Sequence, residues 1–321
     1  MLLKQIKQKI ASAQSVYRAR GWHQLRNAFF RDIYALVLRW VGQRFVTRSI
    51  FDFKMILDLD DPGISRALWL YGSRELDHRY MLKNVVDRGS TILDIGANIG
   101  YYVLTEAQLI GSNGKILAFE PSPSNVELLR KNIALNNLSG VEVTEAAVSD
   151  TSGESALFLS KESNLNSLHG DAVLSPKHVQ QAISVKIIDV FEILEAETTI
   201  DLIRMDIEGH EVSVLNRVAD FVERSKKGPT IIFETHQRAY SQANDITTPI
   251  GRLLDLGYDA KMVSSSNEQG TEILERLGAL VETKIKTDDY IRSMHVGVSN
   301  RLLLDCLGGY GGIRTVCLEK Q

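Results

Sequence analysis

Hydrophobic and polar residues follow two rhythms along the middle of the chain. Between positions 91 and 235, short apolar runs alternate with longer segments in which apolar residues recur every three or four positions. The first rhythm predicts buried strands and the second predicts amphipathic helices. Their regular succession is typical of a parallel α/β sheet, because each parallel connection needs a crossover. The expected strands are Thr91–Ile95, Lys115–Glu120, Val141–Ala146, Thr199–Met205 and Pro229–Phe233, and the expected helices are Tyr101–Ile110, Asn125–Leu135 and Glu211–Val222.

Three segments depart from this succession and set the expected domain organisation. Phe51–Asp60 alternates like a strand and ends in a turn, which predicts a hairpin within an N-terminal helical cap. The stretch after Asp150 is too long for an ordinary crossover and is expected to form an inserted hairpin that can serve as a lid. Tyr258–Val263 and Met294–Val298 are predicted as closing strands. The expected parts are a cap over residues 1–74, a main domain over 75–300 with the insertion near 151–187, and a tail over 301–321.

Charge is distributed unevenly, and this changes the interpretation of the cap. The whole chain carries −3, but residues 1–50 hold ten Lys or Arg and a single acid, Asp32, a net charge of +9. A basic amphipathic helix can lie on an anionic membrane, pack on the main domain, or act as a transit peptide, and all three interpretations stay open. Nucleic acid is not an expected partner, because the basic excess is confined to this end and no aromatic and basic motif accompanies it.

The remaining bulk features concern the compartment. No apolar run approaches the ~20 residues that span a bilayer, and no signal-peptide pattern is present. Two cysteines, Cys306 and Cys317, form no disulfide framework or metal-binding spacing. A cytoplasmic location is therefore expected, peripheral to a membrane if the cap docks there.

A glycine-rich turn follows the first expected strand in the segment TILDIGANIG. Gly96 and Gly100 allow close approach of a ligand to the backbone, and the following helix start supplies free N–H groups. Glu120 ends the next strand, where a carboxylate can accept hydrogen bonds from both ribose hydroxyls. Pro121 beside it offers an apolar edge to adenine. These residues predict a site for a nucleoside cofactor.

Asp94 separates two classes of nucleoside cofactor. It stands where a nicotinamide-binding fingerprint normally has an apolar residue, and an acid there would meet a diphosphate badly. The same acid suits the ammonium group of a methionyl moiety, directly or through water. Asn98 also replaces the middle glycine of the dinucleotide fingerprint. S-adenosylmethionine is thus the predicted cofactor, with a nicotinamide-dependent oxidoreductase as an alternative.

Ionisable residues follow the fourth and fifth expected strands. Parallel strands present their carboxyl ends at one edge, so these side chains are expected to converge where the reacting group emerges. Asp206 is predicted to contact the cofactor or the acceptor, while His236, Glu208 and Glu234 all stay open as the general base. The same groups can hold a Mg²⁺-type ion, but ligands on separate strands are not diagnostic, so no metal is assigned. His210 is expected at the surface, at a helix start.

Six ordered motifs resemble those of the FkbM-type methyltransferases. They span roughly residues 75–257 and read DIGANIGYY, FEPSPSNVELLRKN, AAVSD, IDVF, IDLIRMDIEGHE and IIFETH. The resemblance implies a class I, Rossmann-like fold with a seven-stranded, mostly parallel sheet, S-adenosylmethionine as cofactor, and usually O-methylation of a hydroxyl on a sugar or natural product. One departure is Arg204, where the family more often has Lys. The residues it assigns to the cofactor are Asp94, Gly96, Asn98 and Gly100 in the first motif, Glu120 at the ribose, and Ala147 and Val148 beside adenine.

Two matters stay open at this point. A protein that binds S-adenosylmethionine but has lost its chemistry would share the cofactor motifs. The acceptor, whether a small molecule or a glycan, carries no motif, and neither does the oligomeric state.

Overall fold

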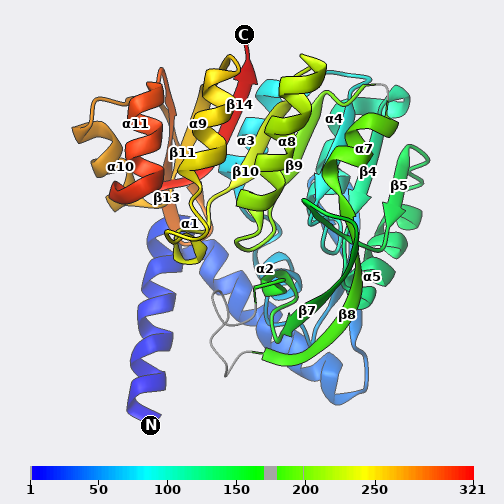
Figure 1. Cartoon of the computed structure of the whole chain (residues 1–321). Coiled ribbons are helices and arrows are strands. Elements are labelled where there is room, and N and C mark those ends of the chain that lie inside the picture. The colour runs from blue at the N-terminus through cyan, green and yellow to red at the C-terminus, as the bar shows by residue number, and fades with distance from the viewer. Residues whose placement is uncertain (1, 170–178, 198) are drawn as a thin grey trace.

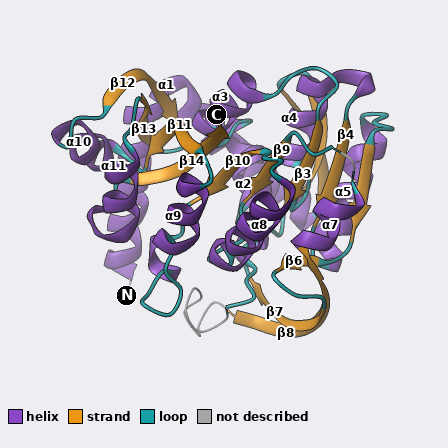
Figure 2. Cartoon of the chain, turned by 45° about the horizontal axis from the view of Figure 1, so that its top comes forward, coloured by secondary structure: helices purple, strands orange, loops and turns teal. Residues whose placement is uncertain are grey.

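The computed structural model describes residues 2–169, 179–197 and 199–321. A nine-stranded sheet forms its centre, with helices on both faces (Figures 1 and 2). The strand order is β12-β13-β11-β14-β10-β9-β3-β4-β5. The strands of this sheet are β3 (Thr91–Ile95), β4 (Lys115–Phe119), β5 (Val141–Thr144), β9 (Leu202–Met205), β10 (Thr230–Glu234), β11 (Tyr258–Ser265), β12 (Leu280–Thr287), β13 (Tyr290–Val296) and β14 (Ile313–Lys320).

Seven of these strands, from β5 to β11, form the expected class I sheet. β5, β4, β3, β9 and β10 are parallel, and β14 runs antiparallel between β10 and β11. The predicted fold class is confirmed. The antiparallel hairpin β12–β13 pairs with β11 and extends the sheet beyond the seven predicted strands.

The C-terminal segment is not a tail, which corrects the expected division at residue 301. β14 fills a place inside the sheet, and its residues Val316, Cys317 and Leu318 are fully buried. Met294–Val298, predicted as a closing strand, falls largely in the added strand β13. The hydrophobic pattern did not predict β14 because four glycines between positions 308 and 312 precede it and its ends are polar.

Alternate residues of the central strands pack against different helical layers. Leu93 and Ile95 of β3 join one buried cluster with α8, whereas Ile92 joins another with α4. Both faces of the sheet are thus covered, as a parallel sheet requires. The first layer contains α7 (Val190–Ala196), α8 (Glu211–Ser225), α9 (Thr247–Asp255) and α11 (Asn300–Asp305); the second contains α2 (Ile64–Tyr71), α3 (Leu76–Val85), α4 (Tyr101–Ile110) and α5 (Pro123–Leu135); α10 (Glu268–Arg276) contacts β11 and β13.

Two smaller units flank the sheet. The N-terminal unit consists of α1 (Leu2–Trp40), which is kinked at Gly21, and the hairpin of β1 (Phe45–Ile50) and β2 (Phe53–Asp58). The insertion forms a three-stranded sheet of β6 (Ala147–Ser149), β8 (Val179–Asp189) and β7 (Gly153–Ser160), with the turn η2 (Ser163–Leu165). Residues 170–178 of the expected insertion lie outside the described residues. Among the described residues, no helix is long and apolar enough to cross a membrane.

Candidate active site

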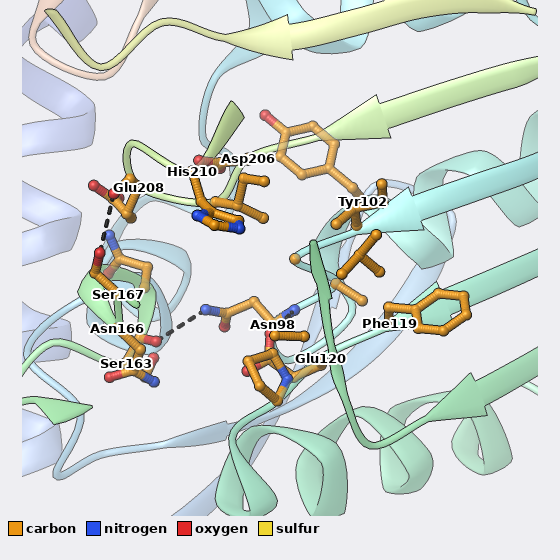
Figure 3. A pocket seen from close by; sticks show the side chains of 18 of the residues that line it. Asn98, Tyr102, Phe119, Glu120, Ser163, Asn166, Ser167, Asp206, Glu208 and His210 are labelled. Carbon is orange, nitrogen blue, oxygen red and sulfur yellow. Dashed lines mark hydrogen bonds between the residues drawn. The ribbon is translucent and has the colours of Figure 1, made fainter. Parts of the chain in front are cut away.

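A pocket lies at the carboxyl ends of β3, β4 and β9, next to the point where the strand order reverses (Figure 3). Ligands bind at this point in open α/β sheets. The pocket has about 830 Å³ of open space, part of it continuous with solvent. The predicted site residues that line it are Gly96, Asn98, Glu120, Pro121, Ala147, Val148, Asp206 and Glu208.

Glu120 is held in place by the glycine-rich turn and by the start of α5. Its carboxylate accepts hydrogen bonds from the backbone N–H of Asn98 at 2.9 Å and of Ser122 at 3.0 Å, and from Nδ2 of Asn125 at 3.2 Å. Burial nevertheless raises the pKa of Glu120 to about 7. The fixed carboxylate faces the pocket next to the apolar walls of Phe119, Pro121, Ala147 and Val148. An acid beside an apolar slot suits a ribose with its attached base.

Asn98 ties the turn to the insertion. Its backbone has φ +50°, in the left-handed region that asparagine tolerates better than most residues. Its Nδ2 donates to the carbonyl oxygen of Ser163, 3.1 Å away on the insertion. The middle position of the motif therefore links the cofactor loop to the segment that covers it.

Asp94 does not line the pocket, so its expected contact with a methionyl ammonium, directly or through water, has no direct support in this geometry and stays a prediction. Its side chain is fully buried and lies opposite Arg204 in the β3–β9 register, with Oδ1 3.1 Å from Nη1. Arg204 in turn places Nη2 3.3 Å from Oδ2 of Asp206, which does line the pocket. Burial raises the pKa of Asp94 in spite of this guanidinium. Asp94 thus acts through Arg204, and the planar fork of an arginine serves both acids at once.

Gly100 also lies outside the pocket lining. It has φ +93° and caps the start of α4, and a Cβ atom there would come within 2.7 Å of Cδ1 of Leu129. Its role is to let α4 begin close to α5. The structure thus shows a packing role for Gly100, and its expected cofactor contact stays a prediction.

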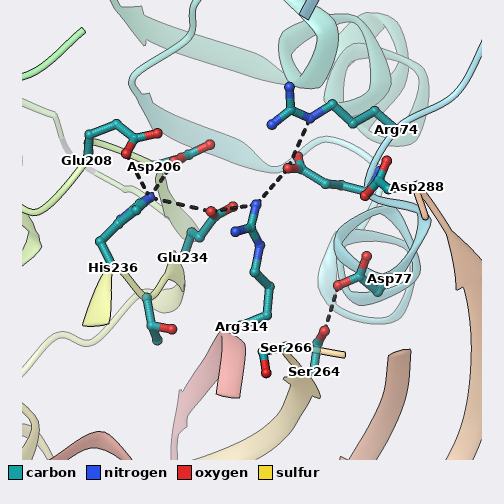
Figure 4. A network of polar contacts seen from close by, with 12 residues as sticks. Arg74, Asp77, Asp206, Glu208, Glu234, His236, Ser264, Ser266, Asp288 and Arg314 are labelled. Carbon is teal, nitrogen blue, oxygen red and sulfur yellow. Dashed lines mark hydrogen bonds and ion pairs between the residues drawn. The ribbon is translucent and has the colours of Figure 1, made fainter. Parts of the chain in front are cut away.

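His236 lies among acids rather than beside the pocket (Figure 4). Its Nδ1 is 2.8 Å from Oε1 of Glu211, and its Nε2 lies 3.4–3.6 Å from carboxylate oxygens of Asp206, Glu208 and Glu234. Although burial disfavours the charged ring, the surrounding carboxylates, Glu211 first, hold the pKa of His236 well above its usual value. A raised pKa favours the protonated ring, and His236 does not line the pocket, so this geometry does not support its expected role as a general base.

Glu234 is also committed to ion pairing. Its Oε1 lies 2.6 Å from Nη2 of Arg314, and the same nitrogen lies 2.9 Å from Oε1 of Glu75. Arg314 keeps the pKa of Glu234 below its usual value despite burial. Glu234 does not line the pocket, and an acid of lowered pKa is a poor general base, so this geometry does not support its expected role either.

Arg74 and Glu75, the two residues before α3, line the pocket although no sequence motif marks either of them. Glu75 accepts a hydrogen bond from the hydroxyl of Tyr102 at 2.7 Å and one from Nε of Arg74 at 3.1 Å. Glu75 has φ +47°, and both it and Arg74 line the pocket. Arg314 completes this group from β14, the strand that had been expected to be a tail.

Asp206 and Glu208 are the acids of the expected cluster that face the pocket. Glu208 has φ +49° and is followed by Gly209 at φ +98°, so the backbone turns sharply beneath it. The hydroxyl of Ser167 donates to the Glu208 carbonyl oxygen at 3.1 Å and fixes this turn. Burial raises the pKa of Asp206 to about 6 and that of Glu208 to about 8. Both groups can exchange protons close to neutral pH.

The sequence model of the methyltransferase FkbM domain matches residues 94–262, more than half of the chain. The chain belongs to the FkbM methyltransferase family. This confirms the expected family and S-adenosylmethionine as its cofactor.

Individual proteins similar to this chain match it over a short segment or at low identity. Methyltransferase sdnD of Sordaria araneosa is 38% identical over 88 residues, which cover 27% of this chain and 33% of the relative. The hexuronic acid methyltransferase AglP of Haloferax volcanii is 22% identical over 65% of this chain and 78% of its own length. The crystal structure of methyltransferase FkbM from Methylobacillus flagellatus aligns with a TM-score of 0.38 at 14% identity, over 72% of this chain and 52% of that one. The chain thus spans a third of the length of its sdnD relative.

Within this family framework, the insertion provides the pocket with a polar cover. Ser163, Asn164, Asn166 and Ser167 all line the pocket. They offer amide and hydroxyl groups to the pocket, and Figure 3 shows Asn166 and Ser167 on the same side of it as Glu208. The insertion therefore covers the site, as its position in the sequence had suggested.

His210 is buried rather than at the surface, which corrects its expected place. It is 9% exposed and lines the pocket. Its Nε2 lies 2.9 Å from the Ser149 hydroxyl and its Nδ1 lies 3.0 Å from Nε2 of His169 on the insertion. Burial lowers the pKa of His210 to about 4, so the ring is neutral at pH 7.

A metal ion could be held by three donors of this site. Ligand atoms of Asp206, Glu234 and His236 lie within 4.8 Å of one another. The negative charges of the two carboxylates are already neutralised, because Arg204 pairs with Asp206 and Arg314 pairs with Glu234. The charge of the cluster is therefore met by protein cations.

Proposed function

We propose that the chain transfers a methyl group from S-adenosylmethionine to a hydroxyl group of a sugar or secondary metabolite. The observation that carries the proposal is one pocket that joins the ribose acid Glu120 to the acids Asp206 and Glu208. When bound, the cofactor supplies a methyl group made electrophilic by its sulfonium charge. The residues of the chain have to position the acceptor in line with this methyl group and remove its proton.

We assign the proton acceptor to Glu208. The Glu208 carboxylate, which is ionised mainly above its pKa of about 8, takes the proton of the acceptor hydroxyl while the hydroxyl oxygen forms a bond to the methyl carbon and the carbon–sulfur bond breaks. Glu208 lines the pocket and has no arginine partner among the described residues, whereas Asp206 is paired with Arg204. Asp206 is then the residue that orients the acceptor. The His236 cation beneath both acids offsets their mutual repulsion.

The polar cover favours a hydroxyl-rich acceptor. Asn164, Asn166 and Ser167 line the pocket with hydrogen-bond donors and acceptors, and Figure 3 shows Asn166 and Ser167 on the same side of it as Glu208. Amides and hydroxyls of this kind match the hydroxyls of a sugar or a polyketide. The relative named as a hexuronic acid methyltransferase supports a sugar acceptor.

The test combines binding and turnover. S-adenosylhomocysteine should bind to wild type and, within a few-fold, to Glu208→Gln. Turnover on a panel of monosaccharides, uronic acids and hydroxylated metabolites should fall by roughly 10²–10⁴ in kcat for Glu208→Gln, the usual contribution of a general base. Glu162→Gln, an exposed residue of the insertion, is the matched control and should match wild type. Turnover should persist in excess chelator, because Arg204 and Arg314 already neutralise the candidate metal ligands.

The competing proposal is a binding protein without chemistry. It predicts that S-adenosylhomocysteine binds while no acceptor is methylated at any pH. Full turnover by Glu208→Gln would instead overturn the assignment of the base and leave the function itself in place.

A further inference from the structure

An apolar stripe is exposed along the second half of α1. Trp22, Phe29, Ile33, Leu36 and Trp40 are separated by seven, four, three and four residues, a spacing that aligns side chains on one side of a helix. Their exposed fractions range from 43% for Ile33 to 87% for Trp40. Exposed patches of this kind mark interaction sites. Three further exposed apolar residues border the stripe, namely Phe30, Val37 and Val41.

Another side of the same helix is fixed to the body of the protein. Ala28, Ala35 and Leu38 are buried. The indole N–H of Trp69 in α2 donates to the carbonyl oxygen of Arg31 at 3.0 Å. The stripe is therefore not the face by which α1 packs on the main domain. Packing of α1 on the main domain therefore explains its buried side but not its exposed apolar stripe.

The charge around the stripe selects its partner. Residues 1–50 carry a net +9; Arg20 and Arg44 are paired with Asp288 and Asp58, whereas Arg26 and Arg39 of the helix are exposed, with Arg26 in line with the stripe. Asp32, the single acid of this region, is paired with Arg66 at 3.0 Å. A second copy docked on the stripe would bring two basic helices together, and the single acid of residues 1–50 is already paired with Arg66. An anionic lipid surface attracts the same basic residues and takes up the aromatic side chains at its interface.

We infer that α1 docks the chain on an anionic lipid surface through the stripe of Trp22, Phe29, Ile33, Leu36 and Trp40. The inference goes beyond the proposed methyl transfer and does not depend on it. In this arrangement the aromatic residues enter the headgroup region, and the exposed Arg26 and Arg39 contact lipid phosphates and carboxylates.

The docking helix is connected to the pocket by a short polar chain. Nε of Arg20 in α1 donates to the carbonyl oxygen of Asp288 at 2.7 Å, and Oδ1 of Asp288 accepts from the backbone N–H of Glu75 at 3.2 Å. Glu75 lines the pocket. Figure 1 shows α1 crossing below the sheet, on the side where the parallel strands have their carboxyl ends. Docking therefore holds the pocket close to the lipid surface.

Sedimentation of the full chain with vesicles tests the inference. Phosphatidylcholine vesicles containing phosphatidylserine should bind the chain, and pure phosphatidylcholine vesicles should not. Binding should weaken at high salt, since the attraction between exposed charges is screened. Equal binding to both vesicle types, or to neither, would overturn the inference.

Two sets of variants separate the contributions. The triple variant Trp22→Ser, Phe29→Ser, Trp40→Ser should lose vesicle binding, and Arg26→Gln with Arg39→Gln should weaken it about fivefold for each positive charge removed. Leu280→Ser with Tyr310→Ser removes exposed apolar residues elsewhere and should bind like wild type. All substituted side chains are exposed, so the fold should persist, and helical circular dichroism checks this.

Two outcomes would contradict the role of the stripe directly. Undiminished vesicle binding by the triple variant is one. The other is a wild-type dimer in analytical ultracentrifugation that the triple variant abolishes, because a second copy would then occupy the stripe. Binding of S-adenosylhomocysteine should be equal in all these variants, so a failure here leaves the proposed function untouched.

Discussion

Nδ1 of His236 lies 2.8 Å from Oε1 of Glu211, whose side chain is fully buried at the first turn of α8. The same oxygen accepts hydrogen bonds from the backbone N–H groups of Ile207 and Gly209 at 3.3 and 3.2 Å. The Glu211 carboxylate thus positions both the turn that carries Glu208 and the imidazole ring of His236.

Glu211→Gln should destabilise the protein by about 2–4 kcal/mol at pH 6, because it leaves a buried cation without its main partner. The folded pKa of His236 is raised, so its stabilisation is complete below pH 6.5 and is lost as the pH rises through the folded value. The folded pKa of Glu211 is lowered, so its contribution is present above pH 4.5 and is lost at lower pH. The difference from wild type should therefore be largest from pH 4.5 to 6.5 and shrink at alkaline pH.

Urea unfolding across this pH range measures the effect, and a titration of the imidazole signals by NMR should show a lower pKa for His236. Glu223→Gln, on the exposed side of the same helix, should change stability by less than about 0.5 kcal/mol. Similar stability of the two variants at pH 6 would show that the Glu211–His236 contact contributes little.

Binding of S-adenosylhomocysteine should strengthen as the pH rises through 7. Burial raises the pKa of Glu120 to about 7, and ribose hydroxyls donate to its ionised form. Below this pKa, affinity should fall about tenfold for each pH unit, since protonation competes with binding. Calorimetry between pH 5.5 and 8 measures the slope. In Glu120→Gln the slope should vanish and the affinity at pH 8 should be lower; an unchanged slope would mean that another group titrates.

Gly96→Ala should disrupt both halves of the site. Gly96 has φ +84°, and a Cβ atom there would lie 2.2 Å from the backbone oxygen of Asp206. The substitution should cost about 2–4 kcal/mol, since strain of the left-handed backbone adds to the overlap. Binding of S-adenosylhomocysteine and turnover should fall together, because Asp206 has to move.

Gly251→Ala in α9 is the matched control for this substitution. It meets no neighbouring atom within 4 Å and has an ordinary helical backbone. Alanine should therefore stabilise the protein there by about 0.5–1 kcal/mol. Thermal melting compares the two variants, and a Gly96→Ala protein as stable as wild type would show that the turn can relax.

Local pattern was sufficient for much of the fold. Thr91–Ile95 and Tyr101–Ile110 form a strand and a helix with the predicted bounds, because an uninterrupted apolar run and a helical apolar stripe are properties of neighbouring residues. The same kind of local pattern predicted that Glu120 lies at the end of a strand. In contrast, the pattern could not show β14, whose glycine-rich approach and polar ends resemble a tail.

The sequence by itself determined the alternation of strands and helices, the family, and the residues around the cofactor loop, since all of these depend on short stretches of chain. The tertiary structure alone decided which charges meet. Asp94 faces Arg204 because β3 and β9 are neighbours, and Glu234 faces Arg314 because β14 inserts beside β10. The pKa of a buried group depends on such distant partners and on its burial, so the choice of Glu208 over His236 as the proton acceptor required the fold.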